Sequence, residues 1–197
     1  MSPPADARTV TAVRAAYDRL DDHVAEMLRD GGPGVSCEVG CDACGHYPLR
    51  ASSWEIETVA DACARLPRLT QRRVRQNVAR ALRVLEPLRR GWTTFPERDG
   101  DRIAYCKAPV RCPLLIHHRC ATYAARPLAC RTHFVVSPPD LCRGGDRPVT
   151  RPDLGAQRHE LVDRLREDGI EESEPDVLFV DGLARALARS TTVSRRR

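Results

Sequence analysis

Residues 37–44 read CEVGCDAC and place three cysteines, Cys37, Cys41 and Cys44, within eight positions. Spacings this short let about one turn of backbone direct several sulfur atoms toward a single point. Zinc takes about four tetrahedral ligands, and an iron–sulfur cluster is held by about four thiolates. Three sulfurs so close together are poorly placed to be independent disulfide partners. The pattern therefore favours a metal site over disulfides.

A second cysteine group follows further along the chain. Cys112 opens a Cys-Pro-Leu-Leu run, Cys120 comes eight residues later, Cys130 lies in an Arg-Pro-Leu-Ala-Cys-Arg run, and Cys142 follows. Proline fixes local backbone angles, which suits a rigid ligand loop. Basic side chains crowd the same segment: Lys107, Arg111, Arg119, Arg126 and Arg131. Nearby cations lower the cost of gathering thiolates, although these side chains could equally be solvated or bind carboxylates elsewhere.

The composition fits a globular protein in a reducing compartment. The chain has 197 residues, 42% of them apolar and 30% charged, which suits one domain with an ordinary core. No apolar run approaches the roughly 20 residues of a membrane helix, and the N-terminus lacks the pattern of a secretory signal. We therefore predict a cytoplasmic protein, in which clustered cysteines are metal ligands or redox groups. Nine cysteines are also an odd number for a closed disulfide framework.

Five stretches have the apolar spacing that is typical of helices. The second is expected to start at Ser52, with Glu55 completing a capping box, and the third is expected to be capped by Thr70. The fifth would carry Pro175 at its first helical position, where proline is tolerated. The five helices are predicted near residues 9–29, 52–66, 70–86, 153–168 and 175–189.

Residues 91–149 break this periodicity. The span holds seven prolines and five cysteines, with a short strand expected at residues 102–106. Metal binding can supply order that secondary structure does not. The predicted fold class is therefore mostly α: a single small domain, residues 9–189, with about five helices around an irregular, metal-stapled, cysteine-rich centre. Residues 1–8 and the basic tail, residues 190–197, are expected to be disordered.

Taken in order, the two cysteine groups resemble the YkgJ-type cysteine-cluster family, described as a zinc- or iron-chelating domain with a CxxCxxCC signature. Members carry a cysteine run, then a Cys-Pro-Phe-Leu-like segment, a cysteine before an Ile/Val-Tyr pair and an Arg-Pro-x-x-Cys-Arg ending. That second half is matched by Cys112, Cys120, Tyr123, Arg126, Pro127, Cys130 and Arg131. Cys142 resembles a further cysteine of some members. The predicted metal ligands are Cys37, Cys41, Cys44, Cys112, Cys120, Cys130 and Cys142.

One position departs from this family's pattern. Members usually have two adjacent cysteines at the end of the first motif, whereas Cys44 is followed here by Gly45 and His46. Either the site has one ligand fewer or another group substitutes, and His46 and Cys106 are the candidates. His46 is at least as well explained as an ordinary surface histidine.

Other cysteines and histidines are expected to be structural. Cys63 falls on the apolar face of the second predicted helix, where a free cysteine behaves as a small hydrophobe. His117 and His118 are expected to form an exposed polar turn, and His133 could contact the site from outside the ligand set. His23 and His159 are read as ordinary helix residues.

The function predicted from these observations is chelation of zinc or an iron–sulfur cluster through clustered cysteines. A protein or redox partner is compatible with this reading, and a related signature in flagellin lysine-N-methylases allows a link to protein modification. Whether the protein is an enzyme is left open, because no nucleophile–base pair, paired carboxylates or phosphate loop is recognisable.

Two alternatives remain. A zinc-stapled nucleic-acid-binding module would use the arginines of the third helix and the tail, but a net charge of only +5 argues weakly for it. A radical SAM-like enzyme would share the C-x3-C-x2-C spacing. That reading lacks the usual aromatic residue before Cys44 and the alternating strands and helices of a barrel.

Overall fold

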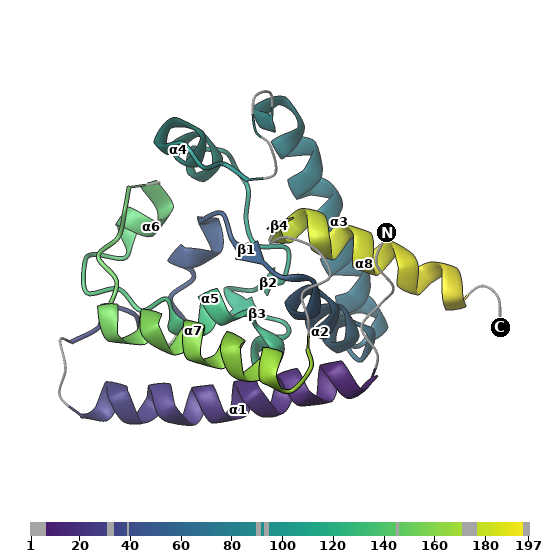
Figure 1. Ribbon diagram of the computed structural model, residues 1–197. Coiled ribbons are helices and arrows are strands. Elements are labelled where there is room, and N and C mark those ends of the chain that lie inside the picture. Colours follow the sequence, from purple (N-terminus) through teal and green to yellow (C-terminus); the bar gives the residue numbers. More distant parts are fainter. Residues whose placement is uncertain are drawn as a thin grey trace.

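The computed structural model describes residues 7–30, 34–38, 40–89, 92, 95–144, 146–170 and 177–194, some of them in α7 and α8 by their backbone alone. Within these residues the fold is mostly helical, as predicted (Figure 1). The helices are α1 (Ala7–Arg29), α2 (Ser53–Ala64), α3 (Arg68–Leu85), α4 (Asp99–Lys107), α5 (Leu128–Thr132), α6 (Asp140–Gly144), α7 (Pro152–Glu167) and α8 (Phe179–Ser194). Three short 3-10 helices accompany them: η1 (Ala43–His46), η2 (Glu86–Arg89) and η3 (Tyr123–Ala125).

Two antiparallel pairs of two-residue strands complete the described fold. One pair joins β1 (Arg50–Ala51) to β4 (Val177–Leu178), and the other joins β2 (Leu115–Ile116) to β3 (Arg119–Cys120). The β1–β4 pair connects the segment before α2 with the segment that leads into α8. These strands are too short to form a sheet layer, so helix packing carries the fold.

The start of α2 confirms the predicted capping box. The Ser52 side chain accepts a hydrogen bond from the Glu55 N–H at 3.4 Å, and the Glu55 carboxylate accepts one from the Ser52 N–H at 2.8 Å. The cap expected for α3 is wrong. That helix begins at Arg68 with Pro67 as its N-cap, so Thr70 lies inside the first turn. Pro67 lies between the C-cap of α2 and the first residue of α3, where its missing N–H leaves no helical hydrogen bond unmade.

Two groups of helices each bury an apolar core. In Figure 1, α1 and α7 run side by side along one edge, and their core is shared with α5 and the start of α2. The other group packs α2, α3 and α8 around Val59, Val78 and Leu183. Helices α2 and α8 approach so closely that a Cβ on Gly182 would collide with the Ile56 side chain. Helix α2 therefore belongs to both cores and connects them.

The centre of the chain contains more helix than predicted. The strand expected at residues 102–106 is wrong, because this segment lies in α4 with Arg102, Tyr105 and Cys106 buried. Those positions repeat at three- and four-residue steps, the spacing of one helix face. The short helices α5 and α6 also interrupt the stretch that was expected to be irregular. Their five-residue lengths leave too little periodicity to detect, and packing against α1, α7, η1 and α4 sustains them.

The ends of the helical region differ from the expected boundaries. Helix α1 begins at Ala7, and α8 continues to Ser194, into the tail that was expected to be disordered. Pro175 and residues 195–197 lie outside the described residues. A search of the described helices finds none with the length and apolarity needed to cross a membrane.

Candidate metal centre

The first cysteine motif is a turn that leads into η1. Gly40 has a φ of 93°, a conformation that glycine adopts without steric cost, and it allows the Cys41 N–H to reach the Glu38 carbonyl at 3.0 Å. Cys37 is half-buried, whereas Cys41 and Cys44 are exposed. The motif therefore presents two of its three side chains at the surface.

The second motif folds into a tight turn followed by a hairpin. The Leu115 N–H donates to the Cys112 carbonyl at 3.0 Å, and β2 then pairs with β3 so that Leu115 faces Cys120. Burial raises the pKa of Cys112 to about 12, and the charge of Cys120 adds to that rise. Backbone hydrogen bonds from Leu114 and Leu115 act in the opposite direction. Hydrogen bonds to a sulfur favour its thiolate form, which is the form that binds metal.

The Arg-Pro-Leu-Ala-Cys-Arg run fixes Cys130 on α5 by anchoring its two arginines to α1. Arg131 is completely buried, its guanidinium lies 3.9 Å from the centre of the Tyr17 ring, and it pairs with Asp21. Arg126 donates to the same Asp21 carboxylate at 3.1 Å. These two arginines therefore bind a carboxylate elsewhere, which was one of the two roles considered for them. Their charges still oppose the rise in pKa that burial causes at Cys120.

Glu55 links the capping box to the segment that carries Cys130. Its second carboxylate oxygen accepts a hydrogen bond from the Leu128 N–H at 2.7 Å, at the first residue of α5. Glu55 is only 2% exposed, so this buried carboxylate satisfies N–H groups at two helix starts. Sequence reasoning identified the cap but gave no indication of the contact 73 residues further on.

The two cysteine motifs meet at Gly45. The Cys112 N–H donates to the Gly45 carbonyl at 2.7 Å. A Cβ placed on Gly45 would lie 3.7 Å from the Cys112 Cβ and 3.4 Å from a methyl group of Leu115. The resemblance to the YkgJ-type family would place a cysteine at this position. Its side chain would therefore face the second motif.

Asp42 fastens the first motif to two other segments. One carboxylate oxygen lies 2.7 Å from His118 Nδ1 on the β2–β3 turn, and the other accepts a hydrogen bond from Arg143 of α6 at 2.5 Å. Burial alone would raise the pKa of Asp42, but the hydrogen bonds from His118 and Arg143 outweigh it, so the pKa lies below its ordinary value. Sequence reasoning missed this residue. Its one sequence signal is a carboxylate between two cysteines of the motif.

On the other side of η1, α6 brings Cys142 next to a histidine. Cys142 Sγ lies 3.6 Å from His133 Nε2, and the His133 ring stacks on Tyr47 with a centroid separation of 6.2 Å. The Val135 N–H points at Cys37 Sγ, 3.5 Å away. Burial lowers the pKa of His133, so its ring favours the neutral form. A neutral imidazole is the form that binds metal.

The pKa of Cys142 shows that this thiol lies near the cysteines of the first motif. Burial raises the pKa of Cys142 to about 12, and the charges of Cys44, Cys37 and Cys41 add to the rise. Burial likewise raises the pKa of Cys44 to about 11, with contributions from Cys41 and Cys37. Cys37 and Cys41 therefore lie close enough to Cys44 and Cys142 for their charges to raise the pKa of these two thiols.

The causes of their raised pKa values likewise connect Cys130 and Cys112 to Cys44. Burial raises the pKa of Cys130, followed by the charges of Cys112, Cys44 and Cys120. Cys44 also contributes to the raised pKa of Cys112. The predicted ligands thus fall into two groups that share Cys44 as a neighbour. In the described part of the chain, however, no three cysteine, histidine, aspartate or glutamate side chains lie close enough to hold one metal ion as they stand.

The cysteine and histidines that were set aside mostly lie where expected. Cys63 is buried between α2, α3 and α8, which confirms its core role. His117 and His118 are exposed at the hairpin turn, with φ values of 50° and 62°. His23 and His159 are exposed on α1 and α7.

The two candidates for the missing ligand have different surroundings. The pKa of His46 is lowered first by burial and then by the charge of Arg111, and no cysteine contributes to it. Cys106 packs in a third apolar cluster with Leu85 and Val110. The charge of its thiolate contributes to the raised pKa of Cys142. Cys106 therefore lies within electrostatic reach of Cys142, whereas His46, the last residue of η1, has Arg111, Asp42 and Arg143 as its charged neighbours.

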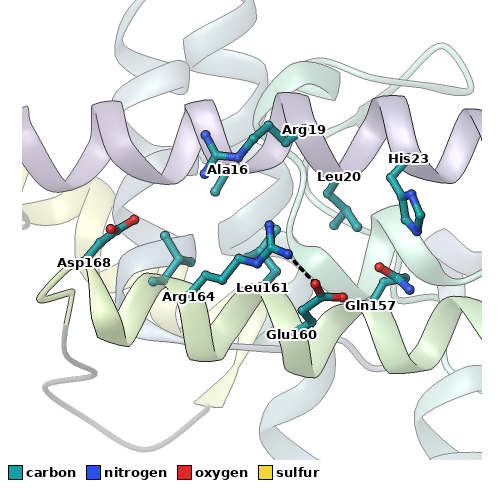
Figure 2. Close-up of a pocket in the computed structure, with 10 residues that line it drawn as sticks. Ala16, Arg19, Leu20, His23, Gln157, Glu160, Leu161, Arg164 and Asp168 are labelled. Atoms are coloured by element: carbon teal, nitrogen blue, oxygen red, sulfur yellow. Dashed lines mark hydrogen bonds and ion pairs between the residues drawn. The ribbon is translucent and has the colours of Figure 1, made fainter.

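A separate recess lies between α1 and α7, away from the cysteines. Figure 2 shows Arg19 and His23 on α1 opposite Glu160 and Arg164 on α7, with Glu160 and Arg164 paired. Its volume is about 240 Å³, and Leu20 contributes to its apolar floor. Since the recess holds paired charges and no cysteine, it has no part in the candidate metal centre.

Comparisons with known protein families, with curated proteins and with solved structures find no match to this chain.

Proposed function

We propose that this protein binds zinc or an iron–sulfur cluster through cysteines of its two motifs, as the resemblance to the YkgJ-type family implies. The ligands would come from Cys37, Cys41, Cys44, Cys112, Cys120, Cys130 and Cys142. The observation that carries the proposal is the position of Cys44, whose charge acts on the pKa of Cys142 in one group and of Cys112 and Cys130 in the other.

The chemistry of these thiols supports a metal cation as their binding partner. Burial and neighbouring sulfurs raise the pKa of Cys44 to about 11 and of Cys112 to about 12, so these two thiols are neutral in the metal-free protein at physiological pH. A bound cation supplies the positive charge that several adjacent thiolates need, and it displaces their protons. Backbone hydrogen bonds from Leu114 and Leu115 lower the pKa of Cys112 and so favour its thiolate form.

Either metal would give these residues a defined role. Zinc would staple η1, the β2–β3 hairpin and α6, each of which is only a few residues long. An iron–sulfur cluster would staple the same elements and would also allow electron transfer or a role in protein modification.

The first test is metal and acid-labile sulfide analysis, with a visible spectrum, on full-length protein purified without oxygen. We expect about one or two zinc ions per chain and no colour, or iron with equivalent sulfide and a broad brown absorbance. A protein with neither metal and with fully titratable thiols would overturn the proposal.

Variants then test whether the two motifs share the site. Replacing both Cys41 and Cys130 by Ala should abolish metal loading, because it removes a thiolate from each motif. Cys63→Ala is the matched control, since Cys63 is buried in the helical core and should leave metal content unchanged. Full metal retention in the double variant would show that the two motifs do not form one site.

One observation favours a second candidate, a nucleic-acid-binding module. Helix α3 contains no acidic residue, and its solvent-facing side is lined with arginines. The exposed ones are Arg68, Arg72, Arg73, Arg80 and Arg83. Salt-dependent binding of a single-stranded RNA 20-mer, lost when Arg72 and Arg73 are changed to Glu, would support this candidate. Binding that is unaffected by the two changes would reject it.

A further inference from the structure

The exposed face of α3 carries arginines that the fold leaves unpaired. Residues 62–85 contain seven arginines and no acidic residue. The exposed arginines of α3 are Arg68, Arg72, Arg73, Arg80 and Arg83. No ion pair among the described residues includes any of them. Arginines on other helices do pair with carboxylates, such as Arg14 of α1, Arg164 of α7 and Arg189 of α8. The cations on α3 are therefore available to an external anion.

The opposite side of α3 is committed to the helical core. Its buried residues are Val74, Val78, Ala81 and Leu85. The helix packs against α8, where Arg75 donates to the Leu187 carbonyl at 2.8 Å. A helix that lies in a lipid surface needs a free apolar face, and that of α3 is already covered. The exposed face therefore suits a polyanion that remains in water.

The exposed arginines form two rows along the helix axis. With about 3.6 residues per turn, one row consists of Arg68, Arg72 and Arg83, and the other consists of Arg73 and Arg80. Between the rows lie the exposed, uncharged side chains of Leu69 and Gln76. At a rise of about 1.5 Å per residue, the rows extend for about 22 Å. Cations thus flank an uncharged strip on both sides.

This arrangement matches the two phosphate backbones that border the major groove of duplex DNA. That groove is about 12 Å wide and admits an α-helix. The major groove of duplex RNA is too deep and narrow for side chains to read. Proteins that bind single strands stack the bases on aromatic side chains, and α3 contains no aromatic residue. The face of α3 therefore favours duplex DNA over duplex RNA and over single strands.

We propose that α3 binds double-stranded DNA in the major groove, with its two arginine rows on the phosphates of the two strands. This inference rests on the nucleic-acid-binding candidate described above and narrows it to one class of nucleic acid. It does not depend on metal binding. Gln76 would face the base edges, but phosphate contacts carry no sequence information. Binding should therefore depend strongly on salt and weakly on DNA sequence.

The test is titration of the full-length protein against a fluorescent DNA duplex of about 20 base pairs, followed by anisotropy at several salt concentrations. Five phosphate contacts give a slope of log K against log salt of about −4.5, a loss of about 500-fold between about 50 and 200 mM salt. Arg72→Ala combined with Arg80→Ala removes one cation from each row and should reduce this loss to about 40-fold.

The matched control is Arg164→Ala combined with Arg166→Ala. This variant also removes two exposed arginines from a helix, but each of them pairs with a carboxylate on α7. It should keep the wild-type salt dependence. Circular dichroism checks that both variants are folded. Equal salt dependence in the wild type and the Arg72/Arg80 variant would overturn α3 as the contact surface.

Two comparison ligands separate this inference from the broader candidate. They are one strand of the same DNA and an RNA duplex of the same sequence, and we expect both to bind more weakly than the DNA duplex. Equal or tighter binding of either would overturn the assignment to duplex DNA and leave nucleic-acid binding in place. A protein that binds none of the three would remove the nucleic-acid candidate itself, whereas metal content is decided separately by analysis of the purified protein.

Discussion

Cys63 differs from the other cysteines in what surrounds it. It lies 2% exposed among Val59, Val74 and Leu183, and burial raises its pKa to about 12. The predicted ligand Cys41 is exposed, and Cys44 is exposed beside other thiols. The same residue type therefore serves as core packing in one place and as a candidate ligand in the other, and helical position alone separated the two in the sequence.

At this residue, alkaline pH should destabilise the metal-free protein. The thiol of the unfolded chain ionises above about pH 9, whereas the folded thiol resists ionisation until about pH 12. Its contribution to stability is therefore complete below pH 9 and is lost between these values, on the order of 1 kcal/mol per pH unit. Denaturant unfolding at pH 8 and pH 10 should show a smaller loss in Cys63→Ala than in the wild type. Equal losses would show that Cys63 is not protected from ionisation.

The arrangement of short elements depends on Asp42. This one buried carboxylate connects η1 to the hairpin through His118 and to α6 through Arg143. Its partners lie 76 and 101 residues away in sequence. Since η1, the β2–β3 pair and α6 are each a few residues long, such contacts position them more than any helix or strand propensity does.

Replacing Asp42 with Asn tests whether its contacts with His118 and Arg143 hold η1, the hairpin and α6 together. The amide keeps the shape but loses the charge, so we expect a loss of about 1–3 kcal/mol in stability and a 10- to 100-fold weaker metal affinity. Both would be measured by chemical unfolding and by competition with a chromophoric chelator. Asp61→Asn is the matched control, because Asp61 also pairs with two arginines, Arg14 and Arg65, but on α2. An Asp42→Asn protein with unchanged metal affinity would mean that the other contacts already fix the motifs.

What the sequence could predict at this scale depended on element length. Helices α1 and α2 carry several turns of apolar spacing, and the Ser52–Glu55 box marks a start that local chemistry determines. Helix α4 was mistaken for a strand because nine residues give barely two turns of pattern. The cysteine spacing identified candidate ligands. It could not identify Asp42 or the His133–Cys142 contact, since both depend on which distant segments the fold brings together.

Across the whole molecule, the second cysteine motif borders two helical cores: Cys112 and Cys120 pack against the α2–α3–α8 core, and Leu128 of α5 lies in the α1–α7 core. The α1–α7 core and the α2–α3–α8 core are apolar, and neither uses a predicted metal ligand among its fully buried residues. Among the described residues, the small cluster at η1 consists of Ala43, Val135 and Cys142, with Cys37 packed against them. Burial of apolar area stabilises the two large cores in proportion to their size, whereas the cluster at η1 is small. We therefore expect stability to differ between these parts of the molecule.

Removal of the proposed metal should expose that difference. With a chelator present, amide hydrogen exchange should increase in residues 36–47, 112–122 and 133–142, while α1, α2, α3 and α8 keep their protection. If the proposed metal binds only the folded state, saturation at about 100 times Kd should add about 2.7 kcal/mol, or a rise in Tm of about 5–10 °C for a chain of this size. Exchange that rises equally in every helix would mean that the metal holds the entire fold, as in a zinc finger. Exchange that changes nowhere in the three segments would place the metal elsewhere, because ligands that lose their ion must lose the order it supplied.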